Sequence, residues 1–314
     1  MTDTAQHHIR ASRKMLQASL VVVAALIGIA LIAHSLRQYN PAQLADAIER
    51  FPSARMLTAM GFAAGSYFCL TFFDYLGLRY AGCGLPWRKA ALASFTSLSL
   101  GHNIGFSALS AGVLRYRFYS RWGASAEQVV KVIFVSATSV AVGLATLAGL
   151  AVLVDPAAVQ LPGGMPHLAI PAIVFFVVPI GYVAACLVLR RSHVYKGVTL
   201  QLPSPQIACL QVVVGTLNFL CVAACLQQCL LAVHDVGFTR VAAAYVAGNI
   251  ATIATHVPGG LGVLETVVQF VVGKQGVIIP LLMFRLIYFI IPLVLGSALL
   301  IGSETYFKSH AARA

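Results

Sequence analysis

The chain has 314 residues, of which 59% are hydrophobic and only 10% are charged, against about 25% charged in an average soluble protein. This composition excludes an ordinary soluble domain. The formal net charge is +12, but the Lys and Arg residues lie beside apolar segments, where they act as topology signals and as contacts for anionic lipid. The charge therefore indicates a membrane surface as the partner, and not nucleic acid.

Six stretches are long and apolar enough to cross a bilayer, for which a helix needs about 20 residues. We interpret the first as a retained span, because it is too long for a signal-peptide core and lacks a convincing cleavage site. The six predicted spans are 15–36, 55–78, 128–153, 168–189, 205–233 and 277–303. The sequence thus predicts an all-α polytopic integral membrane protein that forms a single transmembrane domain over residues 1–314.

Two further apolar segments, 90–114 and 239–273, are broken in the middle by polar, glycine-rich turns. The breaks fall at 101–105 (GHNIG) and at 256–262 (HVPGGLG). Lipid tolerates irregular backbone only where protein or a water-filled cavity satisfies its polar groups. Two such breaks in corresponding positions of two halves indicate a transporter-like site.

Counting Lys and Arg in the connections distinguishes two topologies, because cytoplasmic segments carry the excess of positive charge. Eight ordinary crossings would leave 9 basic residues inside and 11 outside, which is no bias. Six spans with two re-entrant hairpins give 15 inside and 5 outside, with both termini cytoplasmic. We therefore predict eight membrane segments, although a broken span followed by a half-helix stays open for 239–273.

The two halves then match in element order and spacing. Repeat one covers about 15–153 and repeat two about 168–303, with corresponding elements about 150 residues apart. The halves start on opposite sides of the membrane, so the hairpins enter from opposite faces. This is an inverted-topology repeat, in which the two hairpin tips meet near the midplane.

The first hairpin carries four candidate site residues. His102 and Asn103 lie at the break, where a side chain binds either the freed backbone or a ligand. Arg115 has two interpretations: a snorkelling topology anchor, or a contact for a lipid phosphate, which a guanidinium binds with two hydrogen bonds. For Arg117 the anchor interpretation is favoured.

The second hairpin and two spans supply the remaining candidates. An intramembrane ionisable residue is a functional hypothesis by default, and glycines permit close approach of backbone to a ligand. For Asp74, near the end of its span, a capping or interfacial role is an alternative. These candidates for the substrate path are Asp74, Asn249, Thr252, His256, Pro258, Gly259, Gly260, Gly262, Glu265 and Arg285.

No motif for catalysis, nucleotide binding or metal binding is found in the sequence, so we expect no cofactor, no metal and no catalytic residues. Three of the seven cysteines, Cys221, Cys225 and Cys229, recur every fourth residue and share one helix face. We interpret them as small packing residues with free thiols.

The segments 101–120 (GHNIGFSALSAGVLRYRFYS) and 256–265 (HVPGGLGVLE) resemble the transmembrane family of the lysylphosphatidylglycerol synthases, also called the flippase-like family. The resemblance covers nearly the whole chain. It implies a membrane module that moves lipid between leaflets, without the aminoacyltransferase domain of the bifunctional members. It also implies that Asp74, Arg115 and Glu265 are linked to that movement.

Three functions compete at this point. The favoured one is a lipid flippase or lipid transporter of the bacterial inner membrane, with membrane lipids, and among them an anionic phospholipid, as partners. The second is a lipid-modifying transferase that uses His102, His256 and Glu265 as acid–base groups. The third is a non-transporting partner of a lipid-synthesis enzyme encoded elsewhere.

Overall fold

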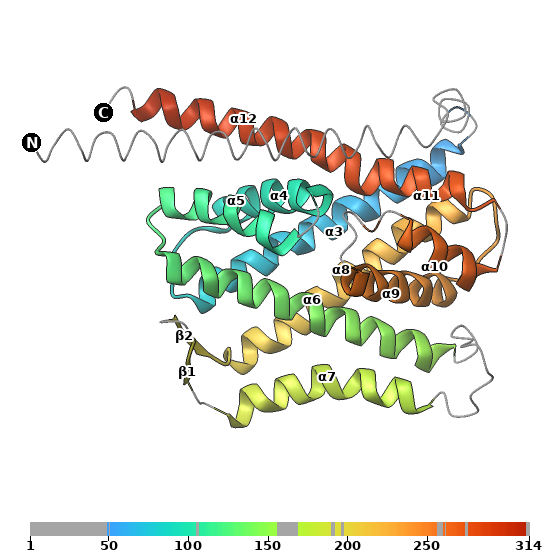
Figure 1. The fold of residues 1–314 in the computed structure, drawn as a ribbon, viewed down its shortest axis with the longest axis horizontal. Coiled ribbons are helices and arrows are strands. Elements are labelled where there is room, and N and C mark those ends of the chain that lie inside the picture. The colour runs from blue at the N-terminus through green and yellow to red at the C-terminus, as the bar shows by residue number, and fades with distance from the viewer. Residues whose placement is uncertain are drawn as a thin grey trace, which may run out of the picture.

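The computed structural model describes Glu49 and the backbone of residues 51–104, 107–155, 169–189, 192–195, 198–255, 260, 262–273 and 276–311. Within them the chain is a helical bundle (Figure 1). Its helices are α3 (Ser53–Tyr80), α4 (Trp87–Ile104), α5 (Ser107–Arg121), α6 (Ala126–Val154), α7 (Ala169–Val188), α8 (Pro205–Leu230), α9 (Phe238–Thr255), α10 (Val263–Val272), α11 (Ile278–Arg285), the π-helix η3 (Leu286–Ile290) and α12 (Ile291–Ala311).

Four stretches of the described chain are long and apolar enough to span a membrane. They are α3, α6, α8 and the continuous run Ile278–Phe307 through α11, η3 and α12. They confirm the spans predicted at 55–78, 128–153, 205–233 and 277–303. The segment predicted at 168–189 forms α7, with its apolar part at Phe175–Val188, and the segment predicted at 15–36 lies outside the described residues.

The starts of α6 and α8 follow from their sequences. Ser125 accepts a hydrogen bond from the Gln128 backbone N–H at 3.2 Å, and the Gln128 side chain accepts one from the Ser125 N–H at 2.9 Å. This capping box satisfies two of the N–H groups that a helix start leaves unpaired. The α8 start uses Ser204 as its cap and Pro205 in the first turn, where a missing N–H costs nothing.

Each of the two broken segments forms two helices, but the break predicted at 101–105 is wrong in its position, because α4 continues through residues 101–104. In the first segment α4 ends at Ile104 and α5 begins at Ser107, and in the second α9 ends at Thr255 and α10 begins at Val263. The first pair of arms is longer than the predicted 90–114, because both helices continue into their basic ends. Lys and Arg are good helix formers, and their long stems lie along apolar surface while the charges reach water.

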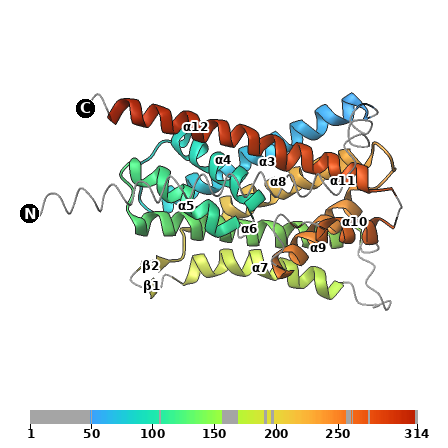
Figure 2. The same ribbon diagram turned by 45° about the horizontal axis from the view of Figure 1, so that its top comes forward.

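The connections between helices gather at two ends of the bundle. The α3–α4, α5–α6 and α7–α8 connections and the C-terminal end of α12 lie at one end, on the left in Figure 1. The α8–α9 connection and the ends of α6 and α10 lie on the right. The α4–α5 pair covers only the left half of the bundle and the α9–α10 pair only the right half, an arrangement that Figure 2 also shows.

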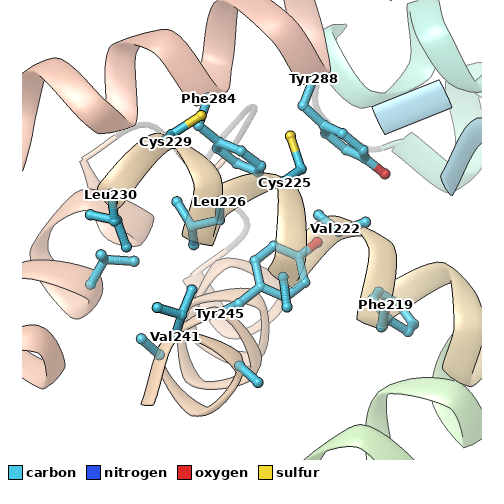
Figure 3. Close-up of a cluster of buried hydrophobic side chains, with 14 of the residues drawn as sticks. Phe219, Val222, Cys225, Leu226, Cys229, Leu230, Val241, Tyr245, Phe284 and Tyr288 are labelled. Atoms are coloured by element: carbon cyan, nitrogen blue, oxygen red, sulfur yellow. The ribbon is translucent and has the colours of Figure 1, made fainter. Parts of the chain in front are cut away.

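The largest core surrounds α8, which packs against α3, α6 and α9. One face of α8 presents Phe219, Val222, Cys225, Leu226, Cys229 and Leu230 to α9 and to the α11–η3 segment (Figure 3). Cys225 and Cys229 are completely buried, and the cysteines of the described chain are free thiols. The interpretation of this cysteine face as packing surface is therefore confirmed.

The helices α6 and α8 cross at a pair of glycines. A Cβ added to Gly143 would overlap the backbone of Gly215, and one added to Gly215 would lie 2.5 Å from the carbonyl oxygen of Ser139. Membrane helices use such small residues to bring their backbones close together. The crossing is held beside this point by Gln211 of α8, which donates to the Val135 carbonyl at 3.0 Å.

One element departs from the all-α prediction. The strands β1 (Ser192–Tyr195) and β2 (Val198–Gln201) form a two-stranded antiparallel hairpin in the α7–α8 connection. Val194, Tyr195, Val198 and Thr199 are residue types that favour strands, but this hairpin was not predicted. The hairpin packs beside the bundle at its left end in Figure 1.

Candidate functional site

A buried ion pair joins the first hairpin to the bundle. The guanidinium of Arg115 on α5 donates from Nε to Asp74 Oδ2 at 2.9 Å and from Nη2 to Asp74 Oδ1 at 2.7 Å. Asp74 lies on α3 and is completely buried, and the Arg115 side chain is 4% exposed. Both charges are therefore neutralised inside the bundle, and Arg115 does not extend to the surface as a snorkelling anchor would.

Two further donors complete the surroundings of Asp74. The Tyr119 hydroxyl of α5 donates to Oδ2 at 2.7 Å, and the Ser136 hydroxyl of α6 donates to Oδ1 at 3.1 Å. A buried ion pair is tolerated only when such additional bonds satisfy its remaining acceptor positions. The carboxylate thus holds α3, α5 and α6 together.

A second ion pair joins the second hairpin to the last span. Arg285, at the end of α11, donates from Nε to Oε1 of Glu265, which lies in the first turn of α10. The side chains are 10% and 18% exposed, so this pair is more open than the first. Of these two ion pairs, this one is the more accessible from outside the bundle.

The second pair also organises the turn before α10. Glu265 Oε2 accepts from the Gly262 N–H at 2.9 Å, and Arg285 Nη2 donates to the Gly260 carbonyl at 3.2 Å. A carboxylate in a first turn is stabilised by the helix dipole and by the unpaired N–H groups there. Glu265 therefore acts both as the counter-ion of Arg285 and as the cap of α10.

The two glycines of this turn have different constraints. Gly260 and Gly262 have φ values of +61° and +79°, a region that other residues rarely adopt. A Cβ on Gly260 would also lie 2.7 Å from Thr252 Oγ1 of α9, whereas one on Gly262 would meet open space. Gly260 is thus required both by conformation and by the close approach of the turn to α9.

The aromatic ring of Phe289 connects the two hairpins. Its centroid lies 6.4 Å from that of His102, at the end of α4, and 5.8 Å from Arg285 Cζ. Phe289 belongs to η3, and a single π-helical turn inside an α-helix frequently marks a functional position. The broken end of the first hairpin and the ion pair of the second therefore lie on either side of one residue.

A polar network lies next to this meeting point. Ser66 of α3 donates to Asn218 Oδ1 of α8 at 2.7 Å and shares a hydrogen bond of 2.8 Å with the Tyr288 hydroxyl. Tyr67 donates to the Tyr288 carbonyl at 3.2 Å, and its ring contacts His102. Buried polar networks of this kind fix one arrangement of the helices around them.

The other predicted site residues are distributed around these features. Arg117 pairs with Glu304 of α12, away from Asp74. Asn249 donates to the Tyr245 hydroxyl at 3.2 Å, and Nδ1 of His102 is buried without a partner among the described residues. Asn103 is described only by its backbone in α4, and His256, Pro258 and Gly259 lie outside the described residues.

Sequence reasoning missed several partners of the predicted residues. Tyr119 and Ser136 contact Asp74, and Glu304 contacts Arg117. Phe289 contacts both His102 and Arg285. In the sequence, these polar partners could be noticed only as hydroxyl or carboxylate side chains within apolar spans. Hydroxyls often bond only their own helix backbone, as Thr146 does here, so this feature does not identify the partner.

An apolar hollow lies between α4 and α12. It is lined by Phe95, Leu295, Ala298 and Leu299, has a volume of about 500 Å³ and is shallow and wide open. Gly296 lies beside it, where a Cβ would overlap Ser99 of α4.

Comparison with known proteins gives a consistent result along most of the chain. Residues 18–296 match the family described as "Lysylphosphatidylglycerol synthase TM region". The uncharacterized protein slr0712 of Synechocystis is 28% identical over 296 residues, which cover 91% of this chain and 90% of that protein. The Escherichia coli inner membrane protein YbhN is 28% identical over 277 residues, 85% of each chain.

Proposed function

Because the chain belongs to the lysylphosphatidylglycerol synthase transmembrane-region family, we propose that it moves a lipid between the two leaflets of the membrane. The observation that carries the proposal is that Phe289 contacts both His102 of the first hairpin and Arg285, the ion-pair partner of the second, while the second arm of each hairpin carries one member of a buried or half-buried ion pair. Lipid movement requires a polar path for the headgroup through the hydrocarbon region. Polar groups at that depth are costly and mark such paths.

We propose an inverted repeat of six spans and two re-entrant hairpins as the architecture of this path. The two helix pairs occupy opposite halves of the bundle (Figure 1), which supports it. Arg115 and Glu265 stand about 150 residues apart and both lie in the second arms of the two hairpins, Arg115 in the middle of α5 and Glu265 in the first turn of α10. They carry opposite charges. Each hairpin would thus form an ion pair with a full span, with the positive member on the first hairpin and the negative member on the second.

In the mechanism that we propose, the phosphate of the lipid headgroup replaces a carboxylate as the ion-pair partner of an arginine. A phosphate offers a guanidinium the same bidentate pairing as a carboxylate. At the more open pair, a phosphate on Arg285 would release Glu265, which still caps α10. The hollow between α4 and α12 would hold an acyl chain during passage.

The proposal assigns no catalytic role to the chain. We place the protein in the bacterial inner membrane, the location that the name of the Escherichia coli relative, inner membrane protein YbhN, gives for that relative. The end of the bundle that carries the α5–α6 connection and the C-terminal part of α12 would face the cytoplasm. The positive-inside rule supports this orientation, because Arg79, Arg88, Lys89, Arg117 and Arg121 lie near that end.

Leaflet-resolved lipid analysis of cells tests the proposal. Cells with and without the gene are compared for total lipid composition and for the lipids accessible at the outer face of the inner membrane. We expect unchanged totals and a shifted distribution of one lipid class, restored by the wild-type protein but not by Glu265→Gln at equal expression. Disappearance of a lipid species would instead indicate a transferase, and no change in either quantity would contradict lipid movement.

A further inference from the structure

Three basic side chains converge at the end of the bundle where α4 begins and α5 ends. Arg117 and Arg121 of α5 both pair with Glu304 of α12, at 2.8 Å and 2.7 Å. Lys89 of α4 lies with Nζ 5.4 Å from the ring of Trp122. Three cations against one carboxylate leave this region with excess positive charge.

Aromatic rings link these charges into one surface. Arg121 Cζ lies 5.0 Å from the ring of Phe307, and the rings of Phe307 and Trp122 are 6.3 Å apart. Trp122 therefore lies between Lys89 and Phe307. We call Lys89, Arg117, Arg121, Trp122, Glu304 and Phe307 the basic aromatic cluster.

We propose that the basic aromatic cluster is a binding site for the headgroup of an anionic phospholipid. Tryptophan is enriched at membrane interfaces, and Trp122 lies at the end of the bundle where α4 begins and α5 ends (Figure 2). The Arg121 side chain is 32% exposed, and a guanidinium carries five donors, so it can bind a phosphate without leaving Glu304. A headgroup thus meets cations and rings at the depth where its acyl chains enter the hydrocarbon.

The contacts distinguish this site from a set of topology anchors. Anchors act singly, each extending its charge to water, whereas Arg117 and Arg121 are held in place by a shared carboxylate. Glu304 orients both guanidinium groups but also competes with an anionic ligand for them. Removal of its charge should therefore strengthen lipid binding, an effect of opposite sign to simple loss of structure.

Lipid binding to the purified full-length protein in detergent tests the proposal. Native mass spectrometry measures binding of phosphatidylglycerol and of phosphatidylcholine with the same acyl chains. A basic residue near an anionic lipid contributes about 1 kcal/mol, so Arg121→Gln should weaken phosphatidylglycerol binding about five-fold and leave phosphatidylcholine unchanged. Glu304→Gln should strengthen phosphatidylglycerol binding, and millimolar inorganic phosphate should not compete with it.

The matched control is Lys131→Gln, because Lys131 also pairs with a carboxylate, Glu127, at 2.8 Å on a helix surface. Equal loss with Lys131→Gln, equal loss for both lipids, or weaker binding after Glu304→Gln would each overturn the proposal. Competition by inorganic phosphate would assign the cluster to a free anion instead. The site does not depend on lipid movement: phosphatidylglycerol binding in a protein that moves no lipid would confirm the cluster and contradict only the proposed function.

Discussion

At the scale of single residues, the charges inside the bundle are arranged as pairs with fixed partners. Asp74 accepts hydrogen bonds from Arg115, Tyr119 and Ser136, and Glu265 accepts from Arg285 and Gly262. Each carboxylate therefore stabilises a junction between helices as well as a charge. A headgroup that enters either pair would alter the packing of a hairpin, which is how binding could be coupled to movement.

The first prediction concerns the Asp74–Arg115 pair. Asp74→Asn leaves a buried guanidinium without its counter-ion and should destabilise the protein by about 3–5 kcal/mol. The double variant Asp74→Leu, Arg115→Met should be much less destabilised, because replacing a whole buried pair by apolar residues is often neutral. Thermal unfolding of the purified protein in detergent measures both effects.

The exposed pair Glu127–Lys131 provides the control for this prediction. Glu127→Gln should cost no more than about 0.5 kcal/mol, because exposed helix pairs contribute little. A double variant as unstable as Asp74→Asn would show that the charges are not the reason for the loss.

The second prediction separates the two glycines of the α9–α10 turn. Alanine at either position meets a positive φ, which costs roughly 1–2 kcal/mol. Gly260→Ala should cost more than Gly262→Ala, since only its Cβ meets Thr252. Adding Thr252→Ala should recover much of that difference in unfolding temperature, and equal losses at the two glycines would contradict the close approach of the turn to α9.

The limits of sequence reasoning at this scale are visible in Arg115 and Glu304. The sequence left Arg115 open between an anchor and a phosphate contact, and the structure buries it against Asp74, 41 residues earlier in the chain. Glu304 was not a candidate, although it pairs with Arg117 from 187 residues away. Pairing across such separations depends on helix crossing and rotation, which a single sequence does not specify.

At the scale of helices, apolar periodicity and turn chemistry were sufficient for the main elements. The spans predicted at 55–78 and 128–153 became Ser53–Tyr80 and Ala126–Val154. The break at 256–262 was placed correctly, because glycine and proline interrupt helices where they cluster, whereas the break predicted at 101–105 was not, because α4 continues to Ile104. The π-helical turn at Leu286–Ile290 was not predictable, since it has the composition of an ordinary apolar helix.

The third prediction concerns the crossing of α6 and α8. Gly143→Ala would push the α6 backbone away from Gly215 and should destabilise the protein by about 1–3 kcal/mol, as overpacking does. Gly61→Ala is the matched control on α3, where a Cβ meets nothing within 4 Å. It should be neutral or stabilising by up to about 1 kcal/mol, from better helix propensity, so unfolding curves should show effects of opposite sign.

At the scale of the whole molecule, the topology that the Lys and Arg residues predict agrees with the arrangement of the helix connections. Outside the two hairpins, each described connection lies at one of two ends of the bundle. Among the described residues, the α3–α4, α5–α6 and α7–α8 connections, predicted to be cytoplasmic, lie at one end, and the α8–α9 connection, predicted to be external, lies at the other (Figure 1). The inverted repeat extends this observation and remains a proposal. Its two halves share spacing but little residue identity, so its direct support is geometric.

The fourth prediction tests the orientation of these two ends. Gly84, between α3 and α4, and Gly237, between α8 and α9, both have open space around a would-be Cβ. In intact cells an impermeant maleimide should label Gly237→Cys, and it should label Gly84→Cys only after the membrane is opened. The unsubstituted protein measures labelling of the native thiols, and the reverse pattern would place the basic end outside.

The most direct measurement is movement of fluorescent phosphatidylglycerol across vesicles that contain the purified protein, followed by an impermeant quencher. Wild-type protein and Lys131→Gln should move the lipid faster than protein-free vesicles do. Glu265→Gln should be slower by about ten-fold or more, because no carboxylate would then displace the phosphate from Arg285; a hydrogen bond to a charged group contributes about 1.5–3 kcal/mol, and 1.36 kcal/mol is about ten-fold in rate. Wild-type vesicles no faster than protein-free vesicles, or Glu265→Gln as fast as the wild type, would contradict lipid movement through the meeting point of the hairpins.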